Sequence, residues 1–293
     1  MREVWILVNA HAGRRHAREN GELIEQVFHQ GGEKTKMAVT DSVRQAQVFL
    51  NQAADAHPDL LVCCGGDGTL SMAVEVLGKA GASLPLGYVP MGTTNDFASS
   101  LGLSKDPVKA AEQILQGSPT PLDLGSFGDR RFLYVASFGV FTQSSYRTPP
   151  LAKATLGHFA YVLEGARELS DLHPCPAEVE ADGQTYSGEF LFGAVSSSTS
   201  LGGVLKLDPE KVRLDDGLLE LTLVRMPRSP VEWGQMLHLL QKGGDGKLVI
   251  QQQVRRVSFS CGEEFPWSLD GEYVPGAEKA EIQVLPHAVD LVL

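Results

Sequence analysis

The first 122 residues alternate between short apolar runs and amphipathic stretches, and this alternation restricts the fold more than any other feature. The strand-like runs lie at 4–8, 37–39, 60–64 and 84–89, and the helix-like stretches lie at 17–30, 43–54, 70–77 and 107–116. A run that is apolar at every position indicates a strand buried on both faces, as in parallel sheets. The alternation therefore predicts an α/β domain in which helices cover both faces of a parallel sheet.

The chain changes character near Leu122, after which most segments are strand-like. The predicted strands lie at 132–138, 177–181, 190–195, 218–224, 256–260, 267–269 and 280–285. Turn signals such as Asp182-Gly183 and Asp270-Gly271 separate them, and two helices are expected at 158–169 and 230–241. We predict a first domain at 1–122 and a β-sandwich domain at 123–285, with residues 286–293 packing back on the first domain.

Charge, cysteine content and hydropathy restrict the functional class. The 293 residues carry a formal net charge of -11, which argues against nucleic acid as a partner, since such proteins need a basic surface. The four cysteines contain no CxxC pair and suggest no disulfide framework, in keeping with a cytoplasmic protein. No apolar run is long enough to span a bilayer. Any membrane contact is therefore expected to be peripheral and transient, at the inner surface.

The stretch GGDGT, residues 65–69, lies between a buried strand and a helix. Helix N-termini attract phosphate through free N–H groups and the helix dipole, and glycines allow the backbone to approach closely. The stretch lacks the GK[ST] of a P-loop. Asp67 would repel phosphate unless a cation lay between them, so it suggests Mg²⁺ on a polyphosphate. A plain strand-to-helix turn is the alternative.

Polar residues also follow the other strands of the predicted sheet. Asn9 and Thr40 end the first two strands, and the segment MGTTNDF, residues 91–97, follows the fourth. In parallel sheets, the loops at the carboxyl ends of the strands line the ligand crevice. The sequence therefore predicts one binding site that is shared by several loops.

Four motifs in this order resemble the diacylglycerol kinase catalytic-domain family, which contains soluble bacterial lipid kinases related to sphingosine kinases. They are GGDGT at 65–69, GTTNDFA at 92–98, DDGLL at 215–219 and LDGE at 269–272. Asp123 in PLDLG and the segment GHFAYV at 157–162 are also similar to that family. The resemblance covers nearly the whole chain.

The resemblance implies a Rossmann-like nucleotide domain of the NAD kinase and diacylglycerol kinase type, followed by a β-sandwich domain. It implies ATP and Mg²⁺ as cofactors, and transfer of the γ-phosphate to a hydroxyl of a membrane lipid such as diacylglycerol, giving phosphatidic acid. The implied cofactor-binding residues are Asn9, Gly13, Thr40, Gly65, Gly66, Asp67, Gly68, Thr69, Thr93, Asn95 and Asp96. The implied catalytic residues are Glu272, as the base, with Asp270 and Asp67. A structural Mg²⁺ is implied at Asp216 and the carbonyls of Arg213 and Leu218.

Two other functions stay open at this point. NAD kinases share GGDGT, although DDGLL and LDGE argue against that reading. A nucleotide-binding regulatory protein without catalysis is the other alternative, because Ser71 and Met72 stand where the family commonly has Asn and Glu. The sequence does not identify the acceptor lipid, and it leaves a homodimer open.

Overall fold

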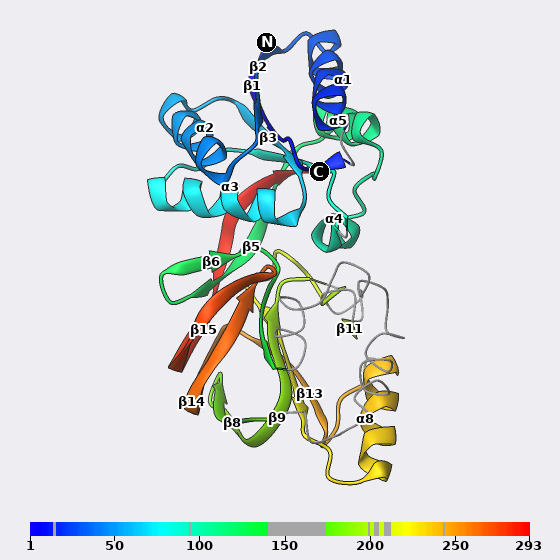
Figure 1. Cartoon of the computed structure of the whole chain (residues 1–293), viewed down its shortest axis with the longest axis vertical. Coiled ribbons are helices and arrows are strands. Elements are labelled where there is room, and N and C mark those ends of the chain that lie inside the picture. Colours follow the sequence, from blue (N-terminus) through cyan, green and yellow to red (C-terminus); the bar gives the residue numbers. More distant parts are fainter. Residues whose placement is uncertain are drawn as a thin grey trace. The chain divides into compact units, whose positions relative to one another are not determined.

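The computed structural model of the chain describes residues 1–293 except 14–15, 94, 140–173, 199, 202–204, 208–211 and 243. The predicted helix at 158–169 and the GHFAYV segment lie outside the described residues. The chain forms two compact units (Figure 1). The first unit contains Met1–Leu122 and His287–Leu293, and the second contains Asp123–Pro286.

The first unit is built on a parallel sheet with the order β2-β1-β3-β4. Its strands are β1 (Glu3–Asn9), β2 (Lys34–Thr40), β3 (Leu60–Gly65) and β4 (Leu86–Pro90). The end of β15 (Glu272–Val292) pairs in parallel with β4 at Leu291 and Leu86. Backbone hydrogen bonds in both directions join Leu293 to Ser118. The C-terminal residues therefore complete the sheet of the first unit.

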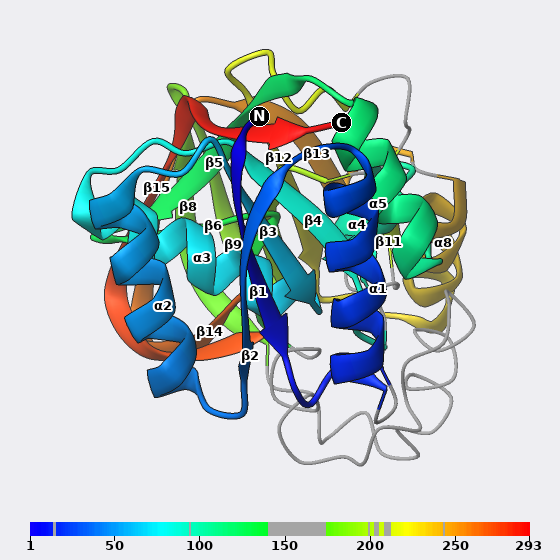
Figure 2. The ribbon, with the colours of Figure 1, turned by 90° about the horizontal axis from the view of Figure 1, so that it is seen from above.

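Among the described residues of this unit, five helices accompany the sheet: α1 (Ala17–Gln30), α2 (Val43–Ala56), α3 (Asp67–Ala80), α4 (Asp96–Ser100) and α5 (Pro107–Gln116). Figure 2 shows α1 and α5 on one side of the sheet and α2 and α3 on the other. Neighbouring residues of β1 point to opposite faces of the sheet, and each face packs against its own pair of helices. Ile6 packs in a cluster with Ile24 of α1 and Ile114 of α5, whereas the Trp5 ring contacts the tilted ring of Phe49 in α2, with ring centroids 5.2 Å apart. The predicted sheet covered on both faces is confirmed.

Local capping explains where two of these helices begin. The Ser42 hydroxyl accepts from the Gln45 N–H at the start of α2. The Asp106 carboxylate accepts from the Val108 and Lys109 N–H groups at the start of α5, and Pro107 occupies the first helical position, as predicted. The five-residue α4 was not predicted, because one turn of helix carries no readable apolar period.

The second unit is mostly antiparallel, with the strand order β13-β12-β9-β7-β14-β15. Its elements are β5 (Pro119–Phe127), β6 (Arg130–Phe132), β7 (Val135–Gly139), β8 (Cys175–Ala181), β9 (Gln184–Ser196), β10 (Ser200–Leu201), β11 (Leu205–Lys206), β12 (Leu219–Arg225), α8 (Pro230–Lys242), β13 (Val249–Val254), β14 (Arg256–Leu269) and β15. Its core includes an aromatic cluster in which the Trp267 ring lies 4.9 Å from Phe138 and 5.0 Å from Phe259.

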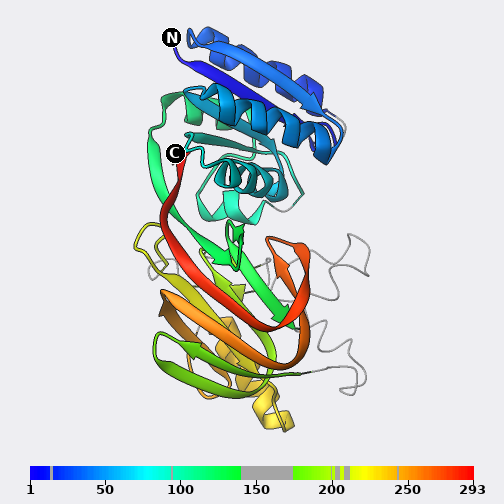
Figure 3. The ribbon, with the colours of Figure 1, turned by 90° about the vertical axis from the view of Figure 1, so that its left-hand side faces the viewer.

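Four strand predictions in this unit were wrong in extent. The segments 256–260 and 267–269 belong to one strand, β14, whose pairing with β15 shifts register between Ser260 and Trp267. These bulges hide the alternation with period two that identifies a strand. The run 280–285 is only part of the 21-residue β15, and Figure 3 shows both strands as long curved ribbons in orange and red. The run 132–138 is divided into β6 and β7.

Candidate active site

Loops at the carboxyl ends of the parallel strands are hydrogen-bonded to one another in the first unit. The Ala10 N–H donates to the Thr40 carbonyl at 2.9 Å, and the Met91 N–H donates to the Gly65 carbonyl at 2.7 Å. The Gly13 N–H donates to the Met91 carbonyl at 2.8 Å. Backbone hydrogen bonds therefore bring three loops to one edge of the sheet. They are the first loop, which follows β1 and begins at Ala10, the GGDGT loop and the MGTTNDF loop.

The Asn9 side chain holds the first loop against the start of α3. Its Nδ2 donates to Thr69 Oγ1 at 3.1 Å, and its Oδ1 accepts from the His11 N–H at 3.0 Å. Thr40 is buried and its hydroxyl donates to the Val8 carbonyl at 3.3 Å. Both predicted residues thus lie at this edge, and their side chains support the loops.

The GGDGT segment forms the N-terminus of the 14-residue α3, with Gly66 as the N-cap. A Cβ on Gly92 would lie 2.6 Å from the Gly66 Cα, so the two loop backbones touch and only glycine fits there. At Gly68 the corresponding position is open, with no atom within 4 Å. The first N–H groups of a helix have no partner within it, and its dipole is positive at that end. The residues present therefore fit a phosphate group.

The Asp67 carboxylate is fixed through both of its oxygens. Oδ1 accepts from the Tyr88 hydroxyl at 3.0 Å, and Oδ2 accepts from the Asp96 N–H at 2.8 Å. Burial raises the pKa of Asp67, and the Asp96 carboxylate raises it further, while the Tyr88 hydroxyl and the Asp96 and Phe97 N–H groups lower it. Two carboxylates close together favour a cation between or beside them, so the donor set fits Mg²⁺.

Asn95 shapes the second loop. It adopts left-handed backbone angles, and its side chain accepts from the Gly92 N–H at 3.0 Å and donates to the Gly92 carbonyl at 2.9 Å. Thr93 in the same loop is exposed. Asn95 is thus occupied with its own loop, whereas Thr93 is open to a ligand. Ser71 and Met72 lie further along α3 and are partly buried.

In the second unit, Asp270 and Gly271 form the two-residue turn between β14 and β15, and both have positive φ. The Asp270 carboxylate is buried and accepts from the N–H groups of Leu133 at 2.6 Å, Tyr134 at 3.0 Å and Val135 at 3.1 Å. These bonds divide β6 from β7. Asp270 therefore anchors the turn that carries Glu272; its catalytic role stays a prediction.

Asp270→Asn is expected to lower the free energy of unfolding by about 2–4 kcal/mol, because the amide keeps one acceptor and turns an NH₂ group toward backbone N–H donors. Chemical denaturation followed by circular dichroism measures this. Asp182→Asn is the matched control, since Asp182 also occupies a turn and accepts from two N–H groups, of Arg255 and Arg256, but is exposed to water. An equal decrease in the free energy of unfolding of Asp270→Asn and Asp182→Asn would contradict the expectation.

Glu272 is the first residue of β15 and its side chain is 61 % exposed. Its Oε2 lies 3.4 Å from Nη2 of Arg130. A base that takes a proton from a substrate must be reachable, and Glu272 is. Arg130 and Tyr88 were both missed by the sequence reasoning. Tyr88 offered one signal, a polar hydroxyl inside an otherwise apolar strand at the binding edge.

The segment DDGLL is tied to the start of the second unit. The Gly217 N–H donates to Asp123 Oδ2 at 2.6 Å, and the Asp123 N–H donates to the Leu214 carbonyl at 2.7 Å. Asp216 Oδ1 accepts from the Leu218 N–H at 3.1 Å, and Arg213 is bonded to Asp215. In the part of the chain that the structure describes, no three His, Cys, Asp or Glu side chains are grouped as metal ligands. The Mg²⁺ site at Asp216, Arg213 and Leu218 stays a prediction.

Glu220 is a buried carboxyl that sequence reasoning missed. It lies on β12 opposite Ser196 of β9 and Gln253 of β13, and is 8 % exposed. Burial raises its pKa to about 8, with Asp216 adding to the increase and Gln253 opposing it. Between about pH 4.5 and 8 the folded protein therefore holds a proton that the unfolded chain has released, so stability falls as pH rises through this window.

Glu220→Gln is expected to remove this pH dependence. Near pH 5 the free energy of unfolding of the variant should equal that of the wild type. Near pH 8 it should be higher than that of the wild type by roughly 2–4 kcal/mol. Urea denaturation in metal-free buffer at pH 5, 6.5 and 8 measures the difference. Glu178→Gln, at an exposed position of β8, should leave the wild-type profile unchanged. A constant difference across the three pH values would show that Glu220 is not the titrating group.

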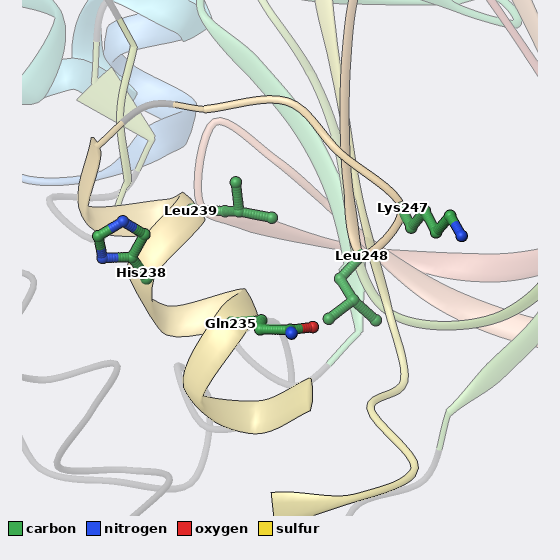
Figure 4. Close-up of a pocket in the computed structure, with 5 residues that line it drawn as sticks. All are labelled: Gln235, His238, Leu239, Lys247 and Leu248. Atoms are coloured by element: carbon green, nitrogen blue, oxygen red, sulfur yellow. The ribbon is translucent and has the colours of Figure 1, made fainter. Parts of the chain in front are cut away.

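A hollow of about 330 Å³ lies between α8 and the segment before β13. It is lined by Gln235, His238, Leu239, Lys247 and Leu248 (Figure 4). None of the predicted site residues lines it. No helix within the described ranges is long and apolar enough to cross a membrane.

Comparison with known proteins agrees with this arrangement. Residues 3–127 match the family model described as the diacylglycerol kinase catalytic domain, and residues 136–293 match the YegS C-terminal NAD kinase beta sandwich-like domain. A diacylglycerol kinase of Bacillus subtilis is 31 % identical over 276 residues, covering 93 % of this chain and 90 % of that protein. One from Staphylococcus carnosus is 32 % identical over 248 residues, covering 84 % and 80 %.

A solved structure shows the same fold. The crystal structure of a diacylglycerol kinase from Bacillus anthracis superimposes with a TM-score of 0.76 at 20 % identity, covering 99 % of this chain and 96 % of that one. An α/β unit that matches the diacylglycerol kinase catalytic domain, followed by a β-sandwich-like unit, defines the class of protein. The chain belongs to the diacylglycerol kinase family, and the predictions of this family, of its fold class and of a lipid kinase are confirmed.

Proposed function

We propose that the protein transfers the γ-phosphate of ATP, with Mg²⁺, to the free hydroxyl of diacylglycerol and so forms phosphatidic acid. One observation supports this above all. The N-terminus of α3 leaves Gly68 open to a phosphate, and the Asp67 carboxylate lies beside it, fixed through both oxygens. A phosphoryl-transfer site needs positioning and charge neutralisation more than covalent chemistry.

The residues have distinct roles in this proposal. The α3 N-terminus and the loops at Gly13 and Gly92 hold the phosphates of ATP, and Asp67 and Asp96 hold Mg²⁺, which neutralises phosphate charge when bound. The lipid oxygen forms a bond to the γ-phosphorus as the bond to the β-phosphate oxygen breaks. The hydroxyl proton passes to the Glu272 carboxylate. Arg130 pairs with Glu272 at 3.4 Å.

The acceptor lipid requires contact with a membrane surface, which we propose is peripheral, transient and on the cytoplasmic side. The chain carries a formal net charge of -11, so general attraction to anionic lipids would not supply this contact. It would have to come from a local surface.

A kinase assay in mixed micelles tests the function. The purified 293-residue chain with labelled ATP and MgCl₂ should convert dioleoylglycerol into labelled phosphatidic acid, and excess EDTA should abolish the product. Sphingosine, ceramide and monoacylglycerol in parallel reactions test the acceptor. Formation of NADP from NAD without any labelled lipid would identify an NAD kinase. Binding of ATP without turnover on any acceptor would identify a regulatory protein.

A further inference from the structure

Tyr88 connects the two loops of the candidate nucleotide site. It lies on β4 with no exposed surface, and its hydroxyl donates to Asp67 Oδ1 at 3.0 Å. The same hydroxyl lies 3.4 Å from Asn95 Oδ1. Asp67 belongs to the GGDGT loop and Asn95 to the MGTTNDF loop, so one buried oxygen contacts both motifs.

The single proton of the Tyr88 hydroxyl belongs to Asp67. Asn95 Oδ1 already accepts from the Gly92 N–H at 3.0 Å, and its contact with Tyr88 is the longer of the two. The carboxylate is the stronger acceptor, since hydrogen bonds to charged groups are shorter and stronger than neutral ones. The Tyr88 hydroxyl is therefore a donor to Asp67.

This bond restricts the orientation of the carboxylate. The Asp96 N–H fixes Oδ2 at 2.8 Å, and the Tyr88 hydroxyl fixes Oδ1, so the carboxylate cannot rotate about its terminal torsion without breaking a bond. A carboxylate has about four lone-pair positions, and three donors, the Tyr88 hydroxyl and the Asp96 and Phe97 N–H groups, use up to three of them. At least one position is left for a cation. Groups that orient a metal ligand in this way commonly change metal affinity by about 10–100-fold when removed.

We propose that Tyr88 is a positioning residue, whose hydroxyl holds the Asp67 carboxylate in the orientation that receives the Mg²⁺ of MgATP. This inference rests on the nucleotide site of the proposed function. It assigns Tyr88 no contact with ATP or with the acceptor. The ring is fully buried on β4, and only the hydroxyl oxygen acts on Asp67.

The substitution Tyr88→Phe tests the role of the hydroxyl separately from that of the ring. It keeps the buried aromatic volume and removes one donor from Asp67. Tyr186→Phe is the matched control, since the Tyr186 hydroxyl bonds to Gln184 at 2.6 Å and Gln252 at 2.7 Å in the second unit, outside the nucleotide loops. Thermal melting without ligand should show that both variants fold.

The measurement is the affinity for ATP by calorimetry, with MgCl₂ and with EDTA, for the wild type and both variants. In Tyr88→Phe, the Kd with MgCl₂ should rise about tenfold, while the Kd with EDTA stays within twofold of the wild type. The half-saturating Mg²⁺ concentration at fixed ATP should rise by the same factor. Tyr186→Phe should change neither value.

Two results would overturn the inference. If Tyr88→Phe weakens ATP binding equally with and without Mg²⁺, Tyr88 only supports the fold of the loops. If it leaves both affinities unchanged, its hydroxyl does not position Asp67. Should the wild type bind ATP without any benefit from Mg²⁺, the inference is also wrong. A wild type that binds MgATP but phosphorylates no lipid would refute the proposed function alone, and the titrations would still decide the role of Tyr88.

Discussion

Glu272→Gln is expected to lower kcat for lipid phosphorylation by about 10²–10⁴-fold, with little change in the KM for ATP. The amide keeps the shape of the side chain but cannot take the proton of the attacking hydroxyl. The position tolerates the change, because Glu272 is 61 % exposed and its contact with Arg130 is a surface ion pair at 3.4 Å. The free energy of unfolding should therefore change little. Steady-state rates in mixed micelles measure the decrease in kcat directly.

Glu281→Gln is the matched control for Glu272→Gln. Glu281 lies on the same strand, β15, is 66 % exposed, and pairs with Arg256 at 2.8 Å. Its substitution removes the same charge from a similar surface position, so kcat should stay within about twofold of the wild type. If Glu272→Gln keeps wild-type kcat, or if both variants lose activity equally, Glu272 is not the base.

Asp67→Asn is expected to lower kcat/KM for ATP by about 10²–10³-fold, because a metal ion supplies several kcal/mol of charge stabilisation in phosphoryl transfer. The sign of the effect on binding depends on the metal. With EDTA, the carboxylate repels the phosphates, so the variant should bind ATP as tightly as the wild type or more tightly. With MgCl₂ the order should reverse. Calorimetry under both conditions, together with initial rates, measures this reversal.

Asp55→Asn serves as the control for charge alone, since Asp55 is an exposed residue of α2 in the same unit. Its affinities and rates should match those of the wild type. Unfolding of Asp67→Asn should occur at or above the wild-type denaturant concentration, because burial penalises the charged form of Asp67 and the Tyr88 hydroxyl, unlike the backbone N–H donors around Asp270, can accept from the amide NH₂ group. Loss of ATP binding in both EDTA and MgCl₂ would show that Asp67 does not act through a cation.

Apart from the single-turn α4, the helices and strands of the first unit were predictable because their signals are local. Helix α1 begins and ends where the apolar spacing predicts it, at Ala17 and Gln30, and the cap at Asp106 with Pro107 fixes the start of α5. The apolar runs 4–8 in β1 and 60–64 in β3 indicated burial on both faces. The long β14 and β15 were not predictable in full, because bulges interrupt their alternation and their pairing partners are distant in the sequence.

The sequence by itself determined the alternation of strands and helices in the first unit, the loops that end its strands and the ordered motifs that identify the family. These depend on near neighbours along the chain. Only the tertiary structure decided what the polar groups contact. Tyr88 reaches Asp67 across 21 residues, Glu272 reaches Arg130 across 142, and Asp270 binds the Leu133 N–H across 137. Such contacts depend on strand register and pairing, which are set by packing over the whole unit.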